Sequence, residues 1–186
     1  MMRAQTYSLR PIVETDLEVT LEWRNLPRIR NVMYTDHLIT PEEHYRWFKK
    51  LQKDTEKSCF VFEVNKNPVG VVNLSLDVYN QRATWGFYIG EDRQPKGMGM
   101  IMGYLAMRYI FEDICVQKLC GESFAFNTPS VSFHKRLGFM EEGRLKKHVL
   151  KNGHYEDVIL FAVFQEQWNA NKKELINSIR QRGFCI

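Results

Sequence analysis

The sequence has no apolar run long enough to span a bilayer, no Cys-x-x-Cys pair and no block of basic residues. Its longest apolar stretches, such as residues 98–107 and 158–164, are far shorter than a membrane-spanning helix, and no apolar targeting core follows the N-terminus. The cysteines lie at no metal-ligand spacing, which favours a reducing compartment and a role as small core side chains: Cys59, Cys115, Cys120 and Cys185. We therefore expect a cytoplasmic protein with no membrane contact and no metal site.

Length and charge favour one domain that binds a small anion. The 186 residues, 44% hydrophobic and 26% charged, suffice for one core and are too few for two comfortable ones. The net charge of +4 is mild, and the basic residues are scattered among acidic ones, which favours an anionic small ligand over a nucleic acid. We find no repeat, low-complexity tract or linker, and we expect a single domain over residues 1–186.

Hydrophobic periodicity and turn residues predict a mixture of helices and strands. Strands are predicted at residues 7–13, 59–64, 69–78, 82–89, 119–126, 139–150 and 155–164. Helices are predicted at residues 15–25, around 29–33, at 41–53, at 98–112, just before residues 137–139 and at 165–182. Two capping boxes mark helix starts, Thr15 with Glu18 and Thr40 with Glu43.

A glycine-containing turn, Gln-Pro-Lys-Gly-Met-Gly at residues 94–99, joins the predicted strand 82–89 to the predicted helix 98–112. Gly97 and Gly99 allow a sharp turn and a close approach to a ligand, and the amides at the helix start suit a pyrophosphate. The turn lacks the Gly-Lys-Ser/Thr ending of a nucleoside-triphosphate loop and the glycine spacing of a dinucleotide fingerprint. By itself the pattern also fits a plain glycine turn.

A second segment further along the chain narrows the interpretation. The predicted strand 119–126 runs into Asn-Thr-Pro-Ser at 127–130, and a short helix closes with Leu-Gly-Phe at 137–139. In this order, the two segments resemble the GNAT superfamily of acyl-CoA-dependent N-acetyltransferases over residues 7–164. The resemblance implies a single-domain α/β (α+β) fold, with a mixed, mostly antiparallel sheet of about seven strands and helices on both faces. It also implies that strands 82–89 and 119–126 splay apart to receive the pantetheine arm.

The same resemblance implies acetyl-CoA as the cofactor. The first strand would pair with pantetheine, the turn would bind the pyrophosphate, and the second segment would line the other side. The implied cofactor-binding residues are Phe87, Tyr88, Ile89, Gln94, Lys96, Gly97, Met98, Gly99, Met100, Asn127 and Ser130. The side chains of the methionines on the helix are expected to fill the core.

Two residues are candidates for proton transfer, because an attacking ammonium must lose a proton and a departing thiolate can gain one. Glu122 shares one side of its predicted strand with apolar residues, and burial there would suit a carboxylate that takes up a proton; a surface Glu or a structural ion pair is the alternative. His134 occupies a position where many family members carry a Tyr that protonates the CoA thiolate. Imidazole can do the same, or this side chain only packs.

The acceptor would be bound by the first third of the chain. Its polar and aromatic residues resemble the branch that acetylates UDP-4-amino-4,6-dideoxy-N-acetyl-β-L-altrosamine for pseudaminic acid and flagellin glycosylation. Aromatic or Met side chains would stack on uracil, and Arg or His would meet a pyrophosphate. The implied acceptor residues are Arg24, Met33, Tyr34, His44 and Phe48. Alternatively, Met33 and Phe48 are only the buried faces of amphipathic helices.

Three functions stay open from the sequence. A UDP-amino-sugar N-acetyltransferase is the first. A polyamine or ribosomal-protein N-terminal acetyltransferase is the second, since segments 142–145 and 152–158 occur widely in those relatives; a polyamine enzyme should have an acidic acceptor lining, whereas the early helices carry as much Arg and His as Glu. A non-catalytic acyl-CoA-binding module is the third. A homodimer is compatible with each of them.

Overall fold

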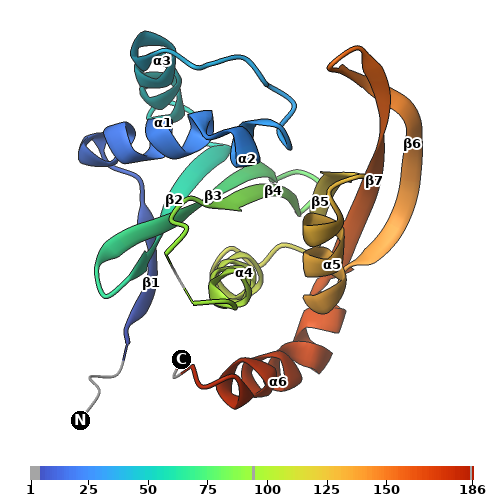
Figure 1. Ribbon diagram of the computed structural model, residues 1–186. Helices are drawn as coiled ribbons and strands as arrows, with labels where there is room; N and C mark the ends of the chain where they lie inside the picture. Colours follow the sequence, from blue (N-terminus) through green and yellow to red (C-terminus); the bar gives the residue numbers. More distant parts are fainter. Residues whose placement is uncertain (1–4, 94, 185) are drawn as a thin grey trace.

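The computed structural model describes residues 5–93, 95–184 and 186, which form a seven-stranded sheet covered by helices on both faces (Figure 1). The strands are β1 (Tyr7–Pro11), β2 (Lys57–Val64), β3 (Asn67–Asp77), β4 (Arg82–Ile89), β5 (Lys118–Phe124), β6 (Met140–Lys151) and β7 (His154–Phe164). The helices are η1 (Glu14–Asp16), α1 (Leu17–Asn25), α2 (Pro27–Arg30), α3 (Pro41–Leu51), α4 (Met98–Arg108), η2 (Tyr109–Asp113), α5 (Thr128–Arg136) and α6 (Gln165–Gln181). Each strand of the sequence prediction is present, with bounds that move by a few residues.

The strand order in the sheet is β1-β2-β3-β4-β5-β7-β6. All neighbours are antiparallel except β4 and β5, which are parallel because α4 and η2 cross over between them. Helices α1, α2 and α3 lie on one side of the sheet, and α4 and α6 lie on the other (Figure 1). The mixed, mostly antiparallel sheet with two helical layers confirms the predicted fold class.

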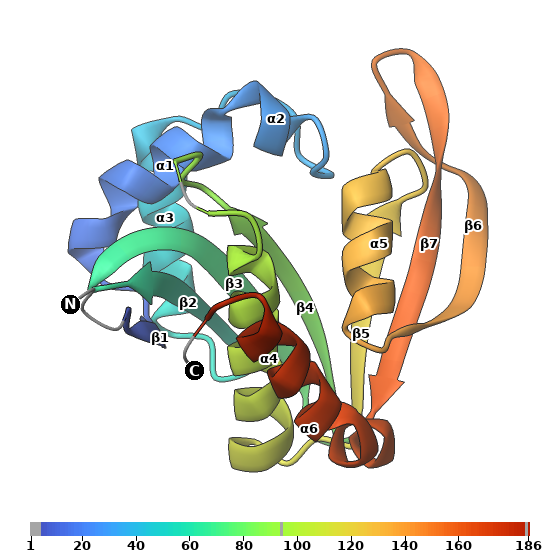
Figure 2. The same ribbon diagram turned by 60° about the horizontal axis from the view of Figure 1, so that its bottom comes forward.

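The parallel pair β4 and β5 holds together only at its beginning. Three residue pairs are in register, the last of them Thr84 with Cys120. Beyond this point the strands diverge, and Figure 2 shows them joined at one end and open at the other. The predicted splay is therefore confirmed, and the edge of β4 over residues 85–89 has no partner from β5.

Both faces of the central strands are buried, so each face contributes to a separate cluster. On β2, Phe60 and Phe62 face α4, whereas Cys59 and Val61 face α1 and α3, as the two-residue alternation of a strand requires. Almost the whole of α4 is buried beneath α5 and α6, including its methionines. The prediction that these methionines fill the core is confirmed.

Two local predictions about helix starts have different outcomes. Thr40 Oγ1 accepts the Glu43 N–H at 3.2 Å and Glu43 Oε2 accepts the Thr40 N–H at 2.9 Å, which confirms that capping box. The box proposed from Thr15 and Glu18 is wrong. The buried Asp16 carboxylate accepts the N–H of residue 13 at 2.9 Å instead, because the segment first forms the 3-10 turn η1.

The cysteines differ in their surroundings. Cys59 is buried as predicted, and Cys120 is half-buried. Cys115 is exposed, with a φ of 63°, because it lies in the loop that follows η2; its predicted place in the core is wrong. Cys185 falls outside the described residues. Among the helices of the described ranges, none has the length and apolar character needed to cross a membrane.

Candidate active site

The opening between β4 and β5 forms a cavity of about 530 Å³. Its walls come from the end of β4, the middle of β5, the start of α5 and the loop after α2, and they include Tyr34, Phe87, Tyr88, Ile89, Gly99, Glu122, Asn127 and Ser130. Most of the residues predicted for the cofactor and for catalysis therefore meet at one place. They meet because the sheet splays, so that side chains of β5 face a space instead of a neighbouring strand.

The glycine turn lies at the N-terminus of α4. Gly97 caps this helix with a φ of 114°, a region that favours glycine, and a Cβ there would lie 2.8 Å from the Phe184 ring. A Cβ on Gly99 would make only ordinary contact with Phe133 at 3.4 Å, so neither packing nor backbone angle requires glycine at this position.

The neighbours of these glycines offer different groups to a ligand. The side chains of Met98 and Met100 are buried in the core, and the Met100 N–H donates to the Gly97 carbonyl at 2.9 Å, which closes the turn. Lys96 is exposed. Gln94, also predicted to bind the cofactor, lies outside the described residues.

The other side of the cavity is formed by the start of α5. Asn127 caps this helix, and its Oδ1 accepts the Ser130 N–H at 3.3 Å. Both residues line the cavity, so the capping and cofactor interpretations of Asn127 are compatible. The unpaired edge of β4, the left-handed glycine at the turn and the open cleft between them fit a long thioester cofactor with a pyrophosphate.

Glu122 projects from β5 into this cavity together with Tyr34. The Tyr34 hydroxyl donates a hydrogen bond of 2.5 Å to Glu122 Oε2, and the Tyr34 ring packs on Phe124 with centroids 5.4 Å apart. Burial and the bond to Glu122 raise the pKa of Tyr34. The expected burial of Glu122 is wrong, because its side of β5 faces the open cleft and the side chain is exposed.

His134 does not face the cavity. Its ring is 1% exposed and stacks on Phe161 with centroids 4.7 Å apart. Nδ1–H donates to the Ser130 carbonyl at 2.9 Å, and Nε2 accepts the Trp85 indole N–H at 3.3 Å. Burial lowers the pKa of His134 to about 4, so the ring is neutral and both nitrogens are engaged. The expectation that His134 protonates a thiolate is corrected by these contacts, which support packing.

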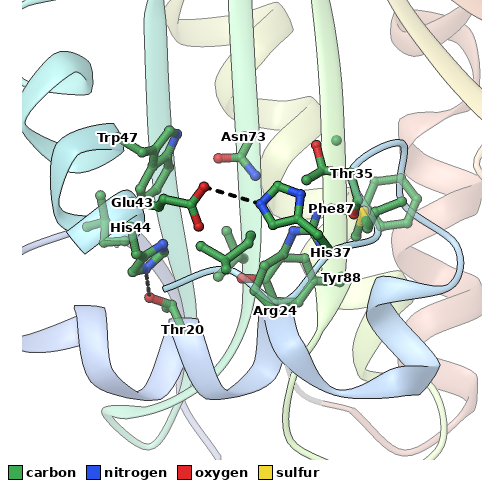
Figure 3. Close-up of a pocket in the computed structure, with 15 residues that line it drawn as sticks. Thr20, Arg24, Thr35, His37, Glu43, His44, Trp47, Asn73, Phe87 and Tyr88 are labelled. Carbon is green, nitrogen blue, oxygen red and sulfur yellow. Dashed lines mark hydrogen bonds and ion pairs between the residues drawn. The ribbon is translucent and has the colours of Figure 1, made fainter. Parts of the chain in front are cut away.

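A second cavity, of about 420 Å³, lies across β4 beneath α1 and α3 (Figure 3). Met33, Phe87 and Tyr88 line both cavities, so the two spaces adjoin. Gly86 also belongs to both walls, and a Cβ on it would meet nothing within 4 Å. The end of β4 is therefore the wall that both spaces share.

Arg24 and His44, two of the predicted acceptor residues, line the second cavity. Arg24 Nη2 donates to the Thr35 carbonyl at 3.0 Å, while its Nη1 is buried and has no hydrogen-bond partner within the described part of the chain. His44 Nε2 lies 3.0 Å from Thr20 Oγ1, and burial, reinforced by the charge of Arg24, lowers its pKa. The cavity therefore presents one cationic group with an unused donor.

Phe48 is not part of either wall. It is 2% exposed and packs in the cluster between α1, α3 and the sheet, so its assignment to the acceptor site is corrected. Trp47, one position earlier and 36% exposed, lines the cavity instead and stacks on His44 (Figure 3). Asn73 also lines it; this polar residue in the apolar run of β3 was a signal that sequence reasoning missed.

A protein-family model described as the acetyltransferase (GNAT) domain matches residues 7–140, more than two thirds of the chain. The chain belongs to the GNAT acetyltransferase family. This GNAT protein is an N-acetyltransferase, and acetyl-CoA is its acetyl donor. Bound acetyl-CoA supplies a thioester carbonyl for attack by an amine, and the cleft between β4 and β5 is the part of the chain that fits it.

Several acetyltransferases are similar to this GNAT enzyme. The prophage-derived N-acetyltransferase YokL of Bacillus subtilis is 30% identical, over 73% of this chain and 79% of its own. Spermidine N(1)-acetyltransferase of Escherichia coli is 26% identical, over 93% and 94%. Acetyltransferase PseH of Campylobacter jejuni is 28% identical, over 67% and 76%. The structure of Vibrio cholerae spermidine N-acetyltransferase with CoA and spermine superposes with a TM-score of 0.82 at 25% identity, covering 88% of this chain and 98% of that one.

Proposed function

We propose that this enzyme transfers an acetyl group from acetyl-CoA to the 4-amino group of a UDP-amino-sugar of the kind used for pseudaminic acid. The similarity to PseH supports this substrate class, and the similarity to spermidine acetyltransferases leaves it open to test. The observation that carries the proposal is the unpartnered guanidinium nitrogen of Arg24 in the wall of the second cavity.

A buried donor without a partner costs free energy, of about 1–3 kcal/mol, until something accepts its hydrogen bond. The Nη1 of Arg24 is such a donor, and a phosphate oxygen or another anionic oxygen is the acceptor that matches a guanidinium best. Burial lowers the pKa of Arg24, yet a guanidinium stays charged at neutral pH. An anionic handle on the substrate would therefore bind here more tightly than a neutral or cationic one.

The charge of the cavity favours the same class of acceptor. Among the described lining residues Glu43 is the one carboxylate, and it already contacts His37 at 3.3 Å and the N–H of residue 40 at 2.9 Å. A polyamine carries several positive charges and would meet Arg24 here with little compensation. Trp47 and Tyr88 add flat apolar surface of the kind that stacks on a nucleobase.

Glu122 is the proposed proton acceptor. The amine must give up a proton as its C–N bond forms, and the carboxylate of Glu122 faces the cleft with Tyr34 hydrogen-bonded to it. The Tyr34 hydroxyl occupies only Oε2 of this carboxylate, which leaves Oε1 to accept the proton of the amine. CoA leaves as the thiolate when the C–S bond breaks, and His134 is too enclosed to give it a proton.

A spermidine-type acceptor is the second candidate, since those relatives align over a larger share of the chain than PseH does. The two candidates separate in a thiol-release assay with acetyl-CoA and a panel of UDP-4-amino-sugar, spermidine and an N-terminal peptide. We expect release with the UDP-amino-sugar and competition by UDP alone. Release with spermidine only, together with no effect of millimolar UDP on rate or melting temperature, would replace the proposed acceptor.

Arg24→Met tests the observation behind the proposal. It keeps most of the stem and removes the donor, so UDP binding measured by calorimetry should weaken by about 1–3 kcal/mol while acetyl-CoA binding stays unchanged. Arg46→Met is the matched control, because Arg46 is exposed on α3 and does not line the cavity. Equal UDP affinity in the two variants would remove Arg24 from the acceptor site.

A further inference from the structure

Lys151, the last residue of β6, is buried in a way that lysines seldom are. Its side chain is 3% exposed, and its Nζ donates to the Met33 carbonyl at 2.8 Å and to Asp36 Oδ2 at 3.2 Å. The ammonium also lies 5.6 Å from the centroid of the Phe124 ring. An ammonium taken out of water is costly unless partners of this kind surround it, so these contacts hold the lysine in place.

The two residues that Lys151 binds lie on either side of Tyr34 in the sequence. Met33 and Asp36 belong to the loop of residues 31–40, which joins α2 to α3 and lines both cavities. Between them, Tyr34 reaches Glu122 with its hydroxyl and packs its ring on Phe124. Phe124 thus touches both Tyr34 and the lysine that holds the loop. The position of the Tyr34 hydroxyl depends on the backbone that Lys151 binds.

Helix α1 also holds the loop, at Thr35, which lies between the two partners of Lys151, and at Ile39 near the end of the loop. Arg24 donates to the Thr35 carbonyl at 3.0 Å, and Asn25 exchanges two hydrogen bonds of 2.9 Å with the backbone of Ile39. Lys151 supplies the attachment on the opposite side of the cleft, from the β6–β7 hairpin. The loop therefore spans the space between α1 and the hairpin.

We propose that Lys151 is a positioning residue for acetyl transfer: it fastens the loop of residues 31–40 to the β6–β7 hairpin and so sets Tyr34 against Glu122. This inference rests on the proposed role of Glu122 and Tyr34 in the reaction. The Lys151 ammonium would then contribute to the reaction without contacting any reacting atom. If the loop moved away, the buried ammonium would lose both oxygen partners, so the hairpin and the loop hold each other.

The first test measures the loop itself by amide hydrogen exchange. Lys151→Met keeps the stem against Phe124 and removes the ammonium, and exchange of residues 31–40 should become about tenfold faster or more. Lys146→Met is the control, because Lys146 is exposed on the same strand. Asp36→Ala removes one partner of Lys151 at a half-exposed position and should also make amide exchange in residues 31–40 faster. This variant replaces Lys151→Met in the test if Lys151→Met does not fold.

The second test measures turnover with whichever amine the wild type acetylates. Lys151→Met should lower kcat by roughly 10- to 100-fold, because small displacements of an active group are that costly. Acetyl-CoA affinity should not change. In the Tyr34→Phe background the same substitution should cost less than about twofold, since its effect passes through Tyr34. Lys151→Arg should recover part of the rate.

Unchanged exchange in residues 31–40 together with wild-type turnover for Lys151→Met would overturn the proposal. Equal losses in the presence and absence of the Tyr34 hydroxyl would also overturn it, because Lys151 would then act by another route. Failure of the proposed acceptor looks different: the UDP-amino-sugar would not be acetylated by the wild type, while the exchange measurement would still decide whether Lys151 holds the loop.

Discussion

Tyr34 and Glu122 are 88 residues apart in the sequence and 2.5 Å apart across the cleft. The bond requires the loop after α2 to reach over the end of β4 to the middle of β5. Because burial and Glu122 raise the pKa of Tyr34, its hydroxyl keeps its proton and donates a hydrogen bond to the carboxylate. The contact joins the loop after α2, which also lines the second cavity, to the cleft between β4 and β5.

Removing either partner of this bond should slow acetyl transfer. Glu122→Gln eliminates the proton acceptor and should lower turnover by about 10²-fold or more, with acetyl-CoA affinity unchanged. Tyr34→Phe should have a smaller effect in the same direction. Steady-state kinetics and calorimetry check both, and Glu141→Gln, an exposed carboxylate on β6, is the control. Normal turnover of Glu122→Gln would exclude this residue as the base.

Gly97→Ala should weaken acetyl-CoA binding and destabilise the fold. An alanine at this position would have to adopt the left-handed backbone of Gly97, which costs about 1–3 kcal/mol of folding free energy. Its Cβ would also press on the Phe184 ring. Gly153→Ala separates the two effects, because its φ of 80° is also left-handed while nothing lies within 4 Å of its Cβ. If both variants bind acetyl-CoA like the wild type, the turn is not the pyrophosphate site.

The buried His134 should make stability depend on pH. Its pKa falls from 6.5 to about 4 on folding, so between these values the unfolded chain binds more protons than the native one. The contribution of neutral His134 to the free energy of unfolding should therefore be fully present above pH 6.5. It should decrease by about 3 kcal/mol in all as the pH falls toward 4.

His134→Phe should remove this part of the slope. Denaturant unfolding of both proteins at pH 5 and pH 7.5 measures it, and the remaining slope should reflect His44, whose pKa is also lowered. Identical slopes in the two proteins would mean that His134 is not buried as a neutral ring. Acetyl transfer by folded His134→Phe should persist, since the imidazole does not face the cleft.

The adjacent aromatic residues Trp47 and Phe48 should respond in opposite ways to truncation. Phe48→Ala empties a core position and should cost about 3–5 kcal/mol of unfolding free energy, whereas Trp47→Ala should cost much less. Trp47→Ala should instead raise the KM for the acceptor. Thermal unfolding and acceptor kinetics check the pair, and an acceptor defect confined to Phe48→Ala would reverse the assignment.

Patterns within short stretches were enough for the fold and for much of the cofactor cleft. The alternation in β2 to β4, the Thr40 capping box and the glycine turn before α4 all depend on near neighbours, so they could be predicted from sequence. The π-helical η2 and the 3-10 turn η1 could not, since both depend on how the neighbouring elements pack.

The lining of the second cavity was predicted less well because helical spacing defines a stripe but not its orientation. His44, Trp47 and Phe48 lie on one stripe of α3, and only the packing of α3 on the sheet puts Phe48 in the core and Trp47 in the cavity. Similarly, two-residue alternation placed Glu122 beside apolar neighbours and suggested burial. The splay of β4 and β5, which is a property of the whole sheet, exposes it.

The sequence by itself determined that this chain has the order of elements, the glycine turn and the Asn-containing second segment of a GNAT acetyltransferase, because these features are local. Only the tertiary structure decided which side chains meet. It enclosed His134 between Trp85 and Phe161, brought Tyr34 to Glu122 and buried Lys151 under a loop more than a hundred residues away. Contacts of this kind depend on how layers pack in space, and no periodicity along the chain records them.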